Sequence, residues 1–118
     1  MYLKGGSTAG IATVTSMPVP PATYYGPVPT DLGVPPEPGM TVNAWIDANL
    51  CGQDETQNIG GEIWFSIDVL ADDFGAAAGC GAPGREVAFE VEPLGIVYTA
   101  VWNNDCVWPL PLERFSCR

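Results

Sequence analysis

Hydrophobic and polar residues alternate in four stretches between residues 40 and 102, which read MTVNAWIDANLCG, GEIWFSIDVLA, REVAFEVE and IVYTAVW. A period of two is typical of half-buried antiparallel strands, because successive side chains point to opposite faces of a sheet. The pattern predicts four strands. In the first three, an aliphatic face is made by Val42, Ala44 and Ile46, by Ile63, Phe65, Ile67 and Val69, and by Val87, Phe89 and Val91. In the fourth, Val97, Thr99 and Val101 lie on one side and Ile96, Tyr98, Ala100 and Trp102 on the other.

Three further segments have strand-like composition: AGIATVTS (9–16), ATYYGPV (22–28) and CVWPLPL (106–112). We expect the last two to be edge strands, because proline is tolerated at a sheet edge. The short PLG between Glu92 and Ile96 predicts a hairpin, and CGQDETQNIGG and ADDFGAAAGCGAPG are expected to be turns. No stretch has a sustained helical period. The sequence therefore predicts an all-β fold, an antiparallel β-sandwich of about seven strands with an N-terminal extension strand.

The chain divides into three segments by composition. Residues 1–17 form a leader of small and polar residues that contains one candidate strand. Residues 18–39 hold eight of the twelve prolines and are interpreted as a stiff strut with a short edge strand. Residues 40–118 are expected to form the sandwich body.

Composition and charge exclude several classes of function. The chain has 118 residues, enough for one domain, and its net charge of −10 argues against a nucleic-acid or anionic-membrane partner, because both require a basic face. There is no histidine, so catalytic sites and zinc sites built on histidine are excluded. No run of 18 apolar residues exists, and we expect no membrane insertion. We expect no cofactor.

The four cysteines, Cys51, Cys80, Cys106 and Cys117, contain no CxxC pair, which disfavours zinc and redox motifs. Two disulfides are the better account, and they indicate an oxidising, extracellular location. Three connectivities are open. Cys51–Cys80 with Cys106–Cys117 is favoured because each bridge closes a local loop, worth about 3 kcal/mol in the chain-entropy model.

The segments GMTVNAWIDANLCG, GEIWFSIDV, GCGAPGREVAFEV and YTAVW together resemble a β-sandwich module of secreted bacterial and archaeal proteins. The module is similar to the carboxypeptidase-regulatory-like, prealbumin-like group, and the resemblance covers roughly residues 23–103. It implies a non-catalytic spacer, adhesion or display unit in which Cys51 and Cys80 pair. Cys106, Cys117 and the leader before Pro18 depart from the module's pattern.

Close carboxylate pairs, Asp72–Asp73, Asp54–Glu55 and Glu90/Glu92, lie in predicted turns or on polar faces, which favours solvated groups over a glycosidase. We therefore expect no enzymatic activity. The stretches DLGVPPEPG and CGQDETQN offer some oxygen ligands for calcium but do not match the twelve-residue calcium loop. Trp45 and Trp64 lie opposite the aliphatic faces of their strands and would form one patch if those strands paired. Three alternatives stay open for this patch: a protein contact, a carbohydrate contact, or cover by the segment with Tyr24 and Tyr25.

An isolated strand in the leader is unstable and needs a partner sheet. It is a disordered tail, an edge strand of its own sandwich, or a donor strand for the next subunit. We favour the donor strand, residues 8–16. The predicted function is an extracellular, pilus-like filament whose subunits join head to tail; a carbohydrate-binding or adhesive module and a plain spacer domain are the alternatives. The predicted subunit contacts are Thr8, Ala9, Ile11, Ala12, Thr13, Val14, Thr15, Trp45 and Trp64.

Overall fold

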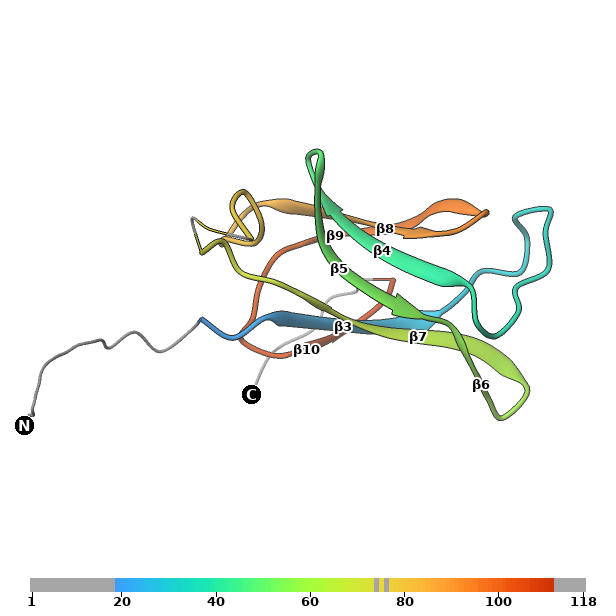
Figure 1. Ribbon diagram of the computed structural model, residues 1–118. Coiled ribbons are helices and arrows are strands. Elements are labelled where there is room, and N and C mark those ends of the chain that lie inside the picture. The colour runs from blue at the N-terminus through green and yellow to red at the C-terminus, as the bar shows by residue number, and fades with distance from the viewer. Residues whose placement is uncertain (1–18, 74, 76, 112–118) are drawn as a thin grey trace, which may run out of the picture.

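The computed structural model describes residues 19–73, 75 and 77–111. These residues form a β-sandwich of two four-stranded sheets without a helix (Figure 1). The first sheet has the order β10-β3-β7-β6, and its strands are Val107–Pro109, Ala22–Pro27, Glu62–Val69 and Gln57–Ile59. The second sheet has the order β5-β4-β8-β9, and its strands are Asn49–Glu55, Thr41–Ile46, Glu86–Val91 and Gly95–Val101.

The predicted all-β sandwich is confirmed, but residues 19–111 as described form eight strands rather than about seven. The stretch from Met40 to Gly52, expected to be one strand, turns back at Asp47 and pairs with itself as the β4–β5 hairpin. Asp47 has a φ of 54°, a left-handed conformation that aspartate tolerates better than most residues. The segment expected to be a turn after Cys51 instead supplies most of β5 and all of β6.

β3 was expected at a sheet edge, and this prediction is wrong. β3 lies between β7 and β10, so the sandwich already includes residues 22–27 of the segment interpreted as a strut. β10 is at the edge, as predicted, but it runs parallel to β3. The chain crosses from β9 in one sheet to β10 in the other, and the first sheet is therefore mixed rather than purely antiparallel.

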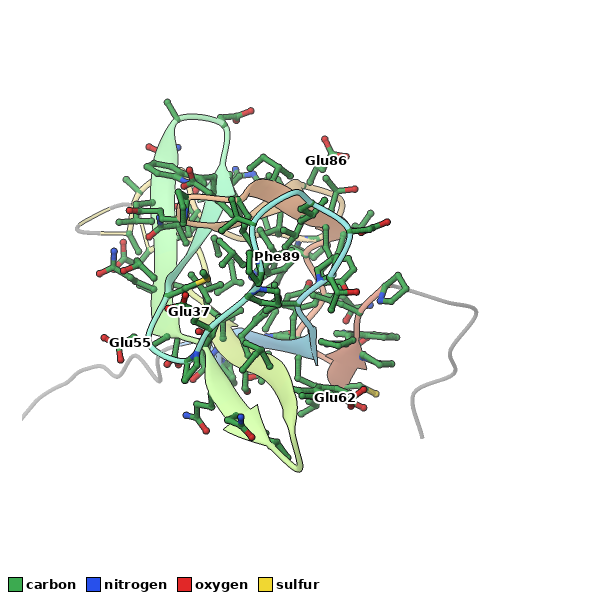
Figure 2. All side chains as sticks on the ribbon, turned by 90° about the vertical axis from the view of Figure 1, so that its right-hand side faces the viewer. Glu37, Glu55, Glu62, Glu86 and Phe89 are labelled. Atoms are coloured by element: carbon green, nitrogen blue, oxygen red, sulfur yellow. A yellow bond between two sulfur atoms is a disulfide. The ribbon has the colours of Figure 1, made fainter. Side chains whose placement is uncertain are left out.

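The core lies between the two sheets and is built from the aliphatic faces that the alternation predicts. Val87, Phe89 and Val91 of β8 are fully buried. Figure 2 shows Phe89 inside the molecule and the labelled Glu55, Glu62 and Glu86 at its outside. The ring of Phe89 lies 5.0 Å from that of Tyr24, centroid to centroid, so the two sheets meet through an aromatic contact.

The face assignment for β9 is half correct. Ala100 and Trp102 are buried, and Val101 is half exposed, as the alternation predicts. Ile96, however, is 53% exposed, because a register shift opposite Phe89 and Glu90 places one extra residue in β9. Such a bulge reverses the sides to which the preceding residues point.

The disulfide between Cys51 and Cys80 is confirmed, with a Cα–Cα distance of 5.5 Å. It joins β5 to the loop that precedes β8. Cys106 is also disulfide-bonded, whereas Cys117 lies outside the described residues. Within the described part of the chain, no helix is long and apolar enough to cross a membrane.

Candidate functional site

The two tryptophans that were expected to share a patch lie in different sheets. Trp45 is on β4 of the second sheet, and Trp64 is on β7 of the first. Their neighbours in the sequence point into the core, so the two side chains face outward from opposite sides of the sandwich. The single aromatic patch is therefore corrected to two separate surfaces.

A hydrogen-bond network holds the Trp45 ring on the outer face of the second sheet. The indole Nε1–H donates to Oε1 of Glu90 at 2.9 Å, and the amide of Asn43 donates to Glu90 and to Glu92. Gln53 donates in turn to the Asn43 side-chain oxygen at 2.9 Å. Hydrogen bonds from Trp45 and then from Asn43 lower the pKa of Glu90, because they stabilise its charged form.

A cavity of about 340 Å³ opens beside this network, at the end of β4 and the start of β8. Its lining residues are Trp45, Ile46, Asp47, Arg85, Glu86 and Ala88. Arg85 is held by Asp72 at 2.9 Å and also donates to the carbonyl of Cys80. The cavity combines one aromatic ring with fixed polar groups, an arrangement that suits a small polar ligand with an apolar face.

Trp64 lies in different surroundings. Its indole Nε1–H donates to Glu62 at 3.2 Å, and it lines a smaller hollow of about 130 Å³ together with Ser66 of its own strand and Tyr25 and Ile59 of the neighbouring strands. Tyr25 pairs with Ser66 across β3 and β7, so it lies near Trp64. Tyr24, the other tyrosine considered as a cover, points into the core instead.

The close carboxylate pairs have structural partners. Asp72 forms the ion pair with Arg85, and Asp73 accepts the backbone N–H groups of Gly75 and Ala77 in the following turn. Asp54 accepts the N–H of Glu55 at 2.8 Å. Among the described residues, no group of three or more cysteine, aspartate or glutamate side chains is arranged to hold a metal ion.

The predicted donor segment cannot be placed, because Thr8, Ala9, Ile11, Ala12, Thr13, Val14 and Thr15 lie outside the described residues. A feature that the sequence interpretation missed is the open edge of β9. Within the described part of the chain, β9 pairs only with β8, and its seven residues, GIVYTAV, include neither a charge nor a proline. The absence of charge and proline in this stretch is visible in the sequence. It indicates an edge open to pairing only once the structure shows that β9 is an edge strand.

Comparison with known proteins returned no match to a family model, to a curated protein or to a solved structure. The resemblance to the carboxypeptidase-regulatory-like group therefore stays a prediction.

Proposed function

We propose that this protein is a non-catalytic structural subunit of an extracellular surface filament. In this proposal, the N-terminal segment of one subunit adds a strand to the sandwich of the next. The observation that carries the proposal is the open β9 edge, because an edge strand without charged residues or proline is a template for pairing with another chain. Since the contact is head to tail, it repeats from subunit to subunit and builds a fibre.

The charge distribution supports the N-terminal segment as the strand that is added. Residues 1–18 contain Lys4 and no carboxylate, whereas Arg85 is the only basic residue between positions 19 and 111. The segment therefore avoids the repulsion that most other parts of this acidic chain would meet at a second copy. The Cys51–Cys80 disulfide is compatible with the extracellular location that the proposal requires.

Deletion of residues 1–17 tests the proposal. The truncated protein is expected to remain folded, because both sheets and their core lie within residues 22–110, and to stay monomeric. Electron microscopy and light scattering after size-exclusion chromatography measure the outcome. A control variant replaces residues 8–16 with a glycine-serine segment of equal length. It keeps the tether but removes the strand former, and it should also stay monomeric. Filaments that form from the truncated protein would refute the proposal.

A second candidate function is carbohydrate binding or adhesion, and the cavity beside Trp45 favours it. Its volume of about 340 Å³ lies in the range of small-ligand pockets, and an aromatic wall beside hydrogen-bonding groups suits a sugar ring. The test is binding to a glycan array by the wild type, Trp45→Ala and Trp64→Ala. Loss of binding in Trp45→Ala alone would support this function. A chain that stays monomeric and binds no glycan would instead be a spacer domain.

A further inference from the structure

In the sandwich that the described residues form, two of the four sheet edges are too short to accept a strand. β10 and β6 have three residues each, and β10 ends in Pro109, which has no backbone N–H to donate. A stable added strand needs a longer run of backbone partners, since strands in proteins typically have about 5–6 residues. β10 and β6 are the two edges of the first sheet, so an added strand would have to pair with an edge of the second sheet.

The β5 edge has seven residues, but it carries charged side chains and two of its outward backbone groups are engaged. The carbonyl of Cys51 accepts the N–H of Leu70 at 2.8 Å, and the N–H of Glu55 donates to the Asp54 carboxylate. Asp54 and Glu55 also place two negative charges at the end of the strand. Engaged backbone groups and charged side chains are the means by which proteins protect sheet edges.

The geometry of the β8–β9 ladder identifies which groups of β9 face outward. The N–H of Trp102 donates to the carbonyl of Arg85 at 2.7 Å, so this pair is a hydrogen-bonded pair of the ladder. Hydrogen-bonded pairs alternate along antiparallel strands, and the backbone groups of Val101 and Thr99 therefore point away from β8. The carbonyl of Val101 accepts the Tyr24 hydroxyl at 2.7 Å, which agrees with this assignment and engages that end of the edge, so an added strand would pair with Thr99 and the residues before it.

We propose that β9 is the acceptor edge and that residues 8–16 of a second copy pair with it. This inference rests on the proposed function and names the surface that the added strand would use. The segment TAGIATVTS has nine residues and no charge, enough to match the seven uncharged residues of β9. Paired strands would extend the second sheet to five and would cover the exposed Ile96 end of the edge.

The variant Thr99→Pro tests this assignment. Proline removes the outward N–H of Thr99 and leaves the β8 ladder intact, since proline is tolerated where the N–H of an edge strand faces solvent. The expected result is a folded monomer that forms no filaments. Glu55→Pro is the matched control, because it removes an outward N–H from the other edge of the same sheet. It should assemble like the wild type.

Amide hydrogen exchange on the unmodified protein gives a second readout that requires no substitution. The Thr99 amide should exchange slowly in filaments and fast in the protein lacking residues 1–17. Slow exchange of the Thr99 amide in a wild-type monomer would mean that the N-terminal segment of the same chain pairs with β9. That result would overturn the proposal that the added strand comes from a second copy. If Thr99→Pro forms filaments and the protein lacking residues 1–17 forms none, β9 is not the acceptor edge. The role of residues 8–16 as donor strand would then still stand. Filaments after the deletion would refute the donor role itself.

Discussion

Tyr24 connects the two sheets through both its ring and its hydroxyl group. The side chain is fully buried, its O–H donates to the carbonyl of Val101 at 2.7 Å, and it accepts the N–H of Asn103 at 3.1 Å. The ring packs against Phe89 of the opposite sheet. The Tyr24 hydroxyl both donates and accepts a hydrogen bond. It stabilises the sandwich, because neither the hydroxyl nor the two backbone groups that it contacts are left without a hydrogen-bond partner.

At the residue scale we predict an alkaline loss of stability. Burial raises the pKa of Tyr24 to about 12, and the hydrogen bond from Asn103 acts in the opposite direction. Between about pH 10 and 12 the unfolded chain releases a proton that the folded state keeps, so the titration of Tyr24 lowers the free energy of unfolding by about 2 kcal/mol over this range. Denaturant titrations at several pH values measure the decrease.

Tyr24→Phe is the control for this prediction. The variant is expected to be less stable below pH 10, since the carbonyl of Val101 and the N–H of Asn103 lose their partner. Its stability should fall less steeply above pH 10. A residual slope remains because burial also raises the pKa of Tyr98. An unchanged slope would contradict the role assigned to Tyr24.

At the scale of elements, β5 is the strand that brings the two sheets close together. A Cβ atom at Gly52 would collide with the backbone carbonyl of Asp68 on β7, so only glycine permits the observed approach. Beside it, Leu70 donates to the carbonyl of Cys51, and the disulfide joins Cys51 to Cys80. The close approach and the hydrogen bond therefore join the sheets at neighbouring residues, where the disulfide also ties β5 to the loop before β8.

We predict that Gly52→Ala destabilises the protein by about 1–3 kcal/mol or more, because the methyl group must push β5 away from β7. Thermal unfolding under non-reducing conditions measures the effect. The Gln53→Ala variant changes the next residue without this collision and is expected to cost less. Equal stability of Gly52→Ala and the wild type would show that β5 can move away from β7 at no cost.

At the scale of the whole molecule, the negative charge opposes association. The net charge is −10, and the outward-facing Glu86 and Glu90 lie on β8, the strand next to the proposed acceptor edge. Two copies must therefore approach against mutual repulsion. The uncharged strands of the proposed contact, residues 8–16 and β9, add nothing to this repulsion.

We predict that filaments grow faster as salt concentration rises, because the screening length decreases from about 30 Å at 0.01 M to about 10 Å at 0.1 M ionic strength. Light scattering follows growth after a jump in sodium chloride concentration. Thr99→Pro should give no signal at either concentration, which separates assembly from non-specific salting out. Slower growth at high salt would indicate that attraction between opposite charges dominates the contact.

The sequence by itself determined the fold class and the buried face of most strands. The aliphatic faces of β4, β7 and β8 could be identified because the period of two is a local property of an extended chain. The Cys51–Cys80 pairing, favoured for its local loop, is also confirmed. Of the candidate site, the outward positions of Trp45 and Trp64 followed from the same alternation.

The tertiary structure alone decided which strands are neighbours. It separates Trp45 from Trp64, places β3 inside its sheet, and leaves β9 at an edge. It also adds the bulge that turns Ile96 outward. Strand order depends on where the chain crosses between sheets, and these contacts join residues far apart in the sequence. Alternation specifies the face of a strand but carries no information on its partner.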